Sequence, residues 1–96
     1  MDTYVILRRG GWADGPELEA AAERSKAEGD KAGDVKWIRS YVLAEDDGRV
    51  GTVCVYQAES PEALERHAAA ADLPSDEIIP VADTVIVRPD PETATA

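Results

Sequence analysis

The sequence is poor in cysteine, histidine and basic residues, and each shortage excludes a class of protein or site. The single Cys54 has no partner for an intramolecular disulfide, and no zinc-type cysteine spacing is present. Because 10 Lys and Arg stand against 20 Asp and Glu, the net charge of −10 repels nucleic-acid phosphates and anionic lipid. We therefore expect no nucleic acid and no membrane surface among the partners of this chain.

Long hydrophobic runs and known catalytic motifs are absent as well. No apolar run approaches the ~18 residues that a membrane span needs. Residues 1–4 lack the basic region of a signal peptide, so we expect a cytoplasmic protein in a reducing setting. There is no glycine-rich phosphate loop, nucleophile elbow or His-Glu-x-x-His motif, and Gly10-Gly11 alone is only a turn signal. The motifs therefore indicate no particular reaction.

The length and composition predict one small domain. With 96 residues and 44% hydrophobic content, the chain is long enough for a single compact unit, which we place at residues 1–88. A domain of this size buries only ~60–65% of its unfolded surface, so association with a second copy would raise that fraction. Residues 89–96 contain nothing able to form a core, and we expect them to be a mobile tail.

Hydrophobic periodicity and helix-capping residues predict six elements in the order strand, helix, strand, strand, helix, strand. This order is the βαββαβ pattern of ferredoxin-like α+β folds, in which both helices cover one face of a four-stranded antiparallel sheet. The expected elements are a strand at 3–9 ended by Gly10-Gly11, a helix from Pro16 to 29–33, strands at 35–43 and 50–58, a helix from Pro61 that ends before Pro74, and a strand within 78–88.

The strand at 35–42 carries large side chains at both alternation phases. Simple alternation places Trp37 and Tyr41 on one face of the sheet. The same alternation places Ile38 and Val42 on the other, so both faces need cover. The helices of the chain cover only one face, and we therefore predict that two sheets pair in a homodimeric α+β barrel.

His67 and Cys54 are the candidate metal-binding residues. His67 shares a helical face with Leu64 and Ala71, so it is either a half-buried histidine bonded to a neighbour or a base or metal ligand in a cleft. Cys54 shares a strand phase with Tyr56 and is either a small buried hydrophobe or, if it meets His67, part of a site for a soft or borderline metal.

A second candidate site lies on the strand at 35–43. Alternation makes Trp37, Arg39 and Tyr41 a same-face triplet, which suits an anion or a carbonyl group. In the alternative interpretation the aromatics fill the core or an interface, and Arg39 reaches an acidic partner. Both helices present mostly alanine to the sheet, so they either pack very close to it or leave a space above the strands.

Five short segments within residues 3–88 carry a family resemblance: VKWIRSY at 35–41, CVYQA at 54–58, SPEAL at 60–64, HA at 67–68 and ADLPSD at 71–76. In this order they resemble a small bacterial domain family of formally unknown function, one branch of which is described as nickel-binding with a dimeric ferredoxin-like fold. The resemblance implies a homodimer and a bound transition metal such as nickel, with His67 as the best match to a family motif. Nickel sites favour several nitrogen ligands, and one histidine per chain supplies only two per dimer unless carboxylates or Cys54 contribute.

The leading functional prediction is a non-enzymatic homodimer that binds a small ligand or a transition metal such as nickel. Its ligand-binding residues would be Trp37, Arg39, Tyr41 and His67, and its metal ligands His67 and Cys54. One alternative is a cofactor-independent oxygenase or isomerase with a pocket between helices and sheet, in which His67 is the general base and Arg39 or Tyr41 polarises a carbonyl. The other alternative is an interaction module without a ligand.

Overall fold

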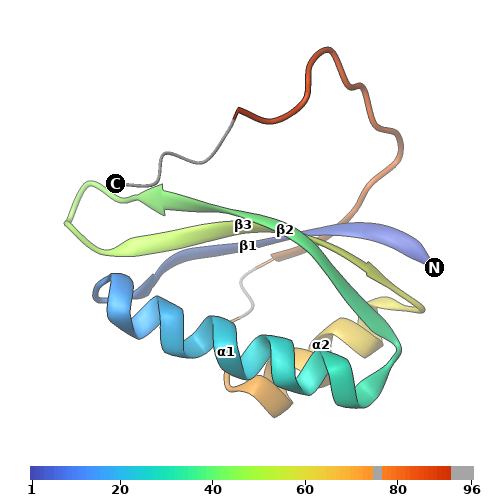
Figure 1. The fold of residues 1–96 in the computed structure, drawn as a ribbon, viewed down its shortest axis with the longest axis horizontal. Helices are drawn as coiled ribbons and strands as arrows, with labels where there is room; N and C mark the ends of the chain where they lie inside the picture. Colours follow the sequence, from blue (N-terminus) through green and yellow to red (C-terminus); the bar gives the residue numbers. More distant parts are fainter. Residues whose placement is uncertain (75–76, 92–96) are drawn as a thin grey trace.

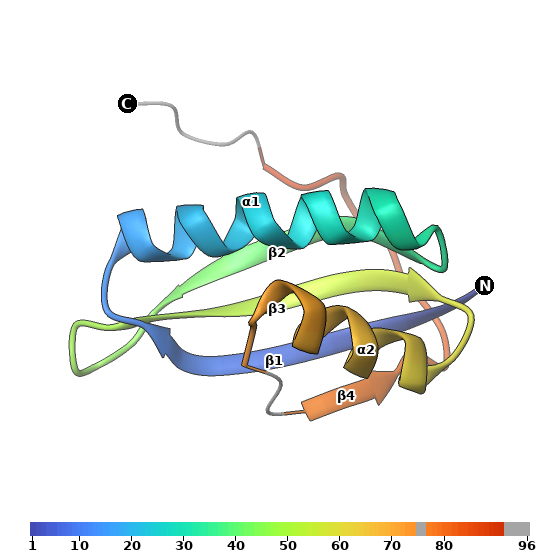
Figure 2. The ribbon, with the colours of Figure 1, turned by 90° about the horizontal axis from the view of Figure 1, so that it is seen from below.

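The computed structural model, which describes residues 1–74 and 77–91, has one antiparallel sheet with two helices on the same face (Figures 1 and 2). The elements are β1 (Asp2–Trp12), α1 (Gly15–Ala32), β2 (Val35–Ala44), β3 (Val50–Ala58), α2 (Pro61–Ala71) and β4 (Glu77–Pro80). The strands lie in the order β2-β3-β1-β4. The predicted ferredoxin-like α+β fold is therefore confirmed.

Side-chain caps begin both helices, and a glycine in the left-handed conformation ends α1. The side chain of Asp14 accepts a hydrogen bond from the Glu17 N–H at 3.0 Å, and the Ser60 side chain accepts one from the Ala63 N–H at 3.2 Å. These are ordinary N-cap bonds, which satisfy donors that the first helical turn leaves free. At the other end of α1, Gly33 has a φ of 74°, the left-handed conformation that stops a helix.

The predicted end of the first strand is wrong. The sequence pattern ends that strand at Gly10-Gly11, but β1 continues to Trp12 after a register shift between Arg8 and Trp12. Gly10 has a φ of 53°, a conformation that glycine adopts freely, so the pair forms an irregularity within the strand. As a result Trp12, like the buried part of β1, lies in the interior.

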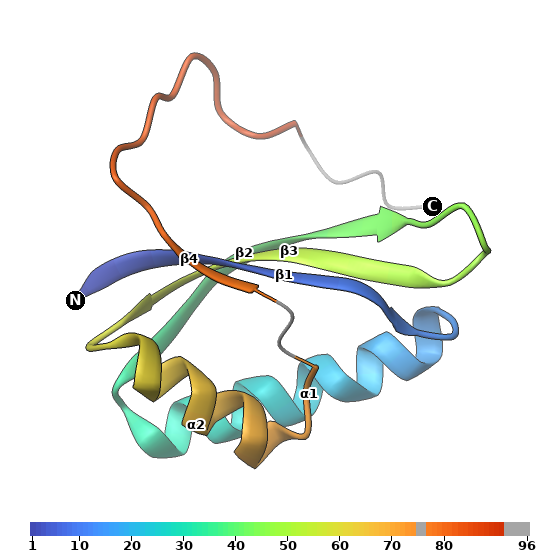
Figure 3. The same cartoon turned by 180° about the vertical axis from the view of Figure 1, so that it is seen from behind.

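The last strand is shorter than the sequence range that contains it. β4 pairs with β1, and its edge position agrees with Pro80, which has no N–H to donate. After the Val81 N–H donates to the Thr3 carbonyl at 2.9 Å, the chain leaves the sheet and passes over the face opposite the helices (Figure 3). Most of the expected tail at 89–96 falls on residues 92–96, outside the described residues.

The core lies between the sheet and the helices. Tyr4 and Ile6 from β1, Tyr56 from β3 and Leu64 from α2 are buried there. The opposite sheet face has no helix over it. Neither helix in the described parts of the chain combines the length and the apolar character needed to cross a membrane.

Candidate functional site

A cavity of about 570 Å³ lies between α1 and the sheet. Its α1 wall includes four residues at helical spacing, Leu18, Ala21, Ala22 and Ser25. Three of these side chains are small, and they leave the space that a row of larger residues would fill. The sequence left open whether alanine-rich helices pack closely or leave a space, and beneath α1 the structure has a space.

The sheet side of the cavity is aromatic. It includes Trp12 and Trp37, the only two tryptophans of the chain, together with Tyr56. The rings of Trp37 and Tyr56 are stacked, with centroids 6.2 Å apart and planes 10° apart. Flat aromatic surfaces of this kind suit the apolar body of an organic ligand.

A chain of buried polar groups connects the two helices to the sheet beside this cavity. The Ser25 hydroxyl lies 2.8 Å from the Tyr56 hydroxyl and 3.0 Å from Nε2 of His67. His67 is only 4% exposed, so the prediction that it points toward the sheet agrees with the structure. Its Nδ1 has no hydrogen-bond partner among the described residues.

The surroundings of His67 disfavour its charged form. Burial lowers the pKa of His67, and the positive charge of Arg8 lowers it further. The carboxylates of Glu28 and Asp34 act in the opposite direction but do not offset burial. Burial likewise raises the pKa of Tyr56, against the effect of its bond to Ser25. His67 and Tyr56 therefore form a neutral pair around the Ser25 hydroxyl.

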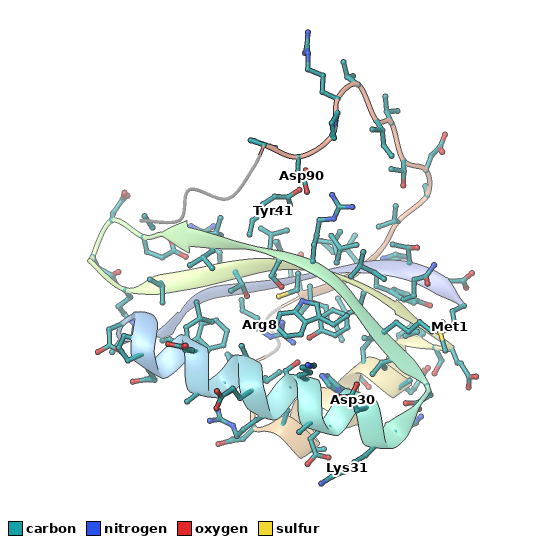
Figure 4. The ribbon with its side chains drawn as sticks, in the orientation of Figure 1. Met1, Arg8, Asp30, Lys31, Tyr41 and Asp90 are labelled. Carbon is teal, nitrogen blue, oxygen red and sulfur yellow. The ribbon has the colours of Figure 1, made fainter. Side chains whose placement is uncertain are left out.

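Arg8 is the functional candidate that the sequence analysis missed. It is 1% exposed and lines the cavity, and Figure 4 places it between the sheet and α1. Its Nε donates to the Pro74 carbonyl at 2.6 Å and its Nη1 to Cys54 Sγ at 3.1 Å. The available signal was its phase, because Arg8 points to the same face of the strand as Tyr4 and Ile6, both of which are buried.

Cys54 is a buried free thiol at the centre of this cluster. Its Sγ accepts from Arg8 and from the Ser40 hydroxyl at 3.0 Å, and it donates to Thr52 Oγ1 at 3.4 Å. Cys54 lines the cavity, whereas His67 lines two smaller ones beside it. The two candidate metal ligands therefore do not line a common cavity in this structure.

The donors present do not fit a complete nickel site within one chain. No group of three or more His, Cys, Asp or Glu residues placed to hold a metal ion occurs in residues 1–74 and 77–91. The Cys54 thiol faces a guanidinium, a cation that disfavours a second cation nearby. Of the carboxylates that line a smaller cavity with His67, Asp34 pairs with Arg66 at 3.0 Å and Glu28 with Lys31 at 3.4 Å. The third, Asp30, lines the other of the two cavities.

The expected same-face triplet of Trp37, Arg39 and Tyr41 is wrong. The pairing of β2 with β3 shifts between Trp37 and Arg39, which makes Ile38 an extra residue and reverses the alternation after it. Trp37 lies on the helix side, while Tyr41 lies on the other side with Asp90 (Figure 4).

Arg39 and Tyr41 share an acidic partner on that other side. The Tyr41 hydroxyl donates to Asp90 Oδ1 at 2.7 Å, and the Arg39 guanidinium binds Oδ2 of the same carboxylate. Hydrogen bonding by Tyr41, and then by Arg39, lowers the pKa of Asp90. Tyr41 and then Asp90 raise the pKa of Arg39. Arg39 also contributes to the lining of the cavity, but its guanidinium is held by Asp90, as the alternative interpretation of this residue expected.

Comparison with known proteins identifies one family and one similar crystal structure. The model of the family described as "Nickel responsive protein SCO4226-like" matches residues 4–81. The crystal structure of SCO4226 from Streptomyces coelicolor A3(2) superimposes with a TM-score of 0.68 at 22% identity, covering 86% of this chain and 99% of that one. At this identity the match shows a shared fold. No curated protein matches the chain.

Proposed function

We propose that this chain, which belongs to the SCO4226-like family of nickel-responsive proteins, is a non-enzymatic homodimer that binds a small organic ligand beneath α1. The observation that carries the proposal is the cavity itself. Its volume of about 570 Å³ lies within the ~300–1,000 Å³ typical of small-molecule sites. Its walls are mostly apolar and aromatic, and a few polar groups face the same space, a combination that gives a ligand both affinity and orientation.

A binding role is favoured over the oxygenase or isomerase alternative by the position of His67. A general base must come within hydrogen-bond reach of the proton it removes, directly or through one water. His67 does not line the main cavity, and its Nε2 faces the Ser25 hydroxyl. Tyr41, offered as a group that polarises a carbonyl, lies on the other face of the sheet with Asp90. Of the sequence-predicted ligand-binding residues, we therefore assign direct ligand contact to Trp37.

The homodimer is proposed from the sheet face that the helices leave uncovered. Tyr41 is 45% exposed and Ile79 is 40% exposed, and Val5 and Val55 on the same face are half-buried. A second copy with the same face would cover these side chains by two-fold pairing. This supports the barrel arrangement over an isolated module, because a single chain of this size leaves the face open to water.

The family match and the side chain of His67 are the two grounds for proposing that the protein binds nickel. The Nδ1 atom of His67 has no hydrogen-bond partner among the described residues, and an imidazole nitrogen is a ligand that nickel accepts. His67 is therefore the residue that we propose for a metal contact. The rest of such a ligand set would come from outside one described chain. Calorimetric titration of tag-free protein with nickel, zinc and copper tests this: binding that is lost in His67→Ala supports it, and binding unchanged in that variant refutes it.

A cavity-filling pair of variants tests the ligand proposal. Ala22 lines the cavity, and Ala20 is an exposed residue on the same helix. Octanoate and octanamide serve as probes, because neither absorbs where tryptophan does and both tryptophans line the cavity. We expect at least one probe to change the fluorescence of the wild type and of Ala20→Leu, and to lose at least about tenfold in affinity in Ala22→Leu. No response from either probe, or equal affinities in the two variants, contradicts the proposal.

A further inference from the structure

Arg8 carries a buried positive charge, and its hydrogen-bond partners among the described residues include no carboxylate. Its Nε bonds a backbone carbonyl of Pro74 and its Nη1 bonds the thiol of Cys54. Its Nη2 is buried and has no hydrogen-bond partner within the described residues. Arginine is almost never fully buried unless it is paired, because removing an unpaired charge from water is costly.

The chain has many carboxylates, and those of its described ion pairs bind other basic residues. It has 20 Asp and Glu, and the ion pairs of the described residues join Arg9 to Glu45, Lys31 to Glu28, Arg39 to Asp90 and Arg66 to Asp34. These pairs are all at least partly exposed to solvent. Arg8 takes part in none of these ion pairs, although it is more deeply buried than any of the four basic residues that do.

Cys54 offers Arg8 a sulfur atom in place of a carboxylate. Its Sγ accepts hydrogen bonds from Arg8 and Ser40 and donates one to Thr52. Among the described residues, the only acidic side chain that lines the cavity is that of Glu19, which is exposed on α1. The guanidinium is therefore left with hydrogen-bonding capacity next to an apolar space.

We propose that the cavity beneath α1 selects monocarboxylates with an apolar body, and that Arg8 binds the carboxylate. This rests on the proposed function and names the class of ligand. The planar fork of a guanidinium matches a carboxylate, and hydrogen bonds between charged groups are about twice as strong as neutral ones. Trp12, Trp37 and Leu18 supply the surface for the apolar body. Because Arg8 supplies a single positive charge and the net charge of the chain is −10, a monoanion is favoured over a phosphate dianion.

Three probes of equal chain length separate charge from hydrophobic binding. Octanoate, octanamide and octylammonium are titrated into the wild type, with tryptophan fluorescence and calorimetry as readouts. We expect octanoate to bind at least about tenfold more tightly than octanamide, and octylammonium to bind least tightly. If octanamide binds as well as octanoate, the carboxylate proposal is overturned while the ligand-binding function stands. If no probe binds, both are overturned.

Two methionine variants test the residue assignment. Arg8→Met removes the buried charge, and Arg9→Met removes the same charge from the next residue, which pairs with Glu45 away from the cavity. We expect Arg8→Met to bind octanoate and octanamide equally, whereas Arg9→Met keeps the preference. An unchanged preference in Arg8→Met overturns the assignment. If circular dichroism shows that Arg8→Met does not fold, Arg8→Lys is used, and there a preference that is undiminished from that of the wild type overturns it.

Discussion

The Ser25 hydroxyl on α1 lies 3.0 Å from Nε2 of His67 on α2, and both groups are buried. The same hydroxyl lies 2.8 Å from the hydroxyl of Tyr56 on β3. One small side chain thus satisfies two larger polar groups and links both helices to the sheet. The small size of Ser25 also leaves room for the neighbouring cavity, which it lines.

Replacing Ser25 by alanine should therefore destabilise the fold. Ser25→Ala leaves the His67 and Tyr56 groups buried without this partner, and each unsatisfied group costs about 1–3 kcal/mol. We expect the free energy of unfolding to fall by about 2–4 kcal/mol in urea denaturation. Lys26→Ala, at an exposed position of the same helix, is the control and should change it by less than about 0.5 kcal/mol. Equal effects of the two changes would contradict the assigned role.

The lowered pKa of His67 predicts a loss of stability in mild acid. Burial and Arg8 hold the pKa below the ordinary 6.5, and the neighbouring Glu28 and Asp34 only partly oppose this. At a pH below 6.5, His67 of the unfolded chain binds a proton that His67 of the folded chain does not. The stability contributed by the neutral, buried imidazole is therefore fully present above pH 6.5 and is lost as the pH falls below it.

Urea denaturation between about pH 7.5 and about pH 5.5 measures this effect. We expect the free energy of unfolding of the wild type to fall over that range, and that of His67→Gln to fall less, because glutamine does not titrate. Exposed carboxylates change both proteins alike, so the difference between the two slopes isolates His67. Parallel slopes would show that the imidazole remains free to protonate in the folded state.

Gly51 on β3 is required by the close approach of its neighbours. A Cβ at this position would lie 2.5 Å from the Arg8 carbonyl oxygen and 2.6 Å from Oε1 of Glu45. We expect Gly51→Ala to reduce the free energy of unfolding by about 1–3 kcal/mol, since backbone must move to make room. Gly15→Ala is the matched control, because nothing lies within 4 Å of its added Cβ, and a Tm close to that of the wild type is expected. A tolerated alanine at Gly51 would contradict the packing described for this part of the sheet.

The open sheet face predicts self-association. Ile79 on β4 is 40% exposed, and Val85, Ile86 and Val87 stand exposed on the same side of the sheet. We expect sedimentation to give a dimer at micromolar concentration and Ile79→Lys to give a monomer, because a buried lysine without a partner opposes the interface.

A surface change elsewhere provides the control for the dimer. Ala69 is exposed on α2, on the opposite side of the molecule from the open face, so Ala69→Lys should remain a dimer. A wild type that sediments as a stable monomer would refute the dimer. A dimer that survives Ile79→Lys would place the interface elsewhere.

Short-range signals in the sequence were sufficient for most of the fold. Pro16 and Pro61 after capping residues located the starts of both helices, and Gly33 and Pro74 bounded their ends. The Asp47-Gly48 turn located the hairpin between β2 and β3. Such signals act within a few residues, so they can be interpreted without knowledge of the rest of the chain.

The wrong face assignment in β2 came from strand alternation carried across an irregular residue. Ile38 adds one residue to β2, which moved Arg39 and Tyr41 to the opposite face from Trp37. The bulge in β2 depends on how this strand pairs with β3, and no residue type within β2 predicts it.

The sequence alone determined the order of the elements, the ends of the helices, the burial of His67 and the small residues of α1, because propensity, capping and periodicity are local. Only the tertiary structure decided that Arg8 is buried without a carboxylate partner among the described residues, that Cys54 and His67 line different cavities, and that Trp37 and Tyr41 lie on opposite faces. These facts depend on distances between segments far apart in the chain. Such distances are set by strand register and helix packing, which act only after the chain has folded.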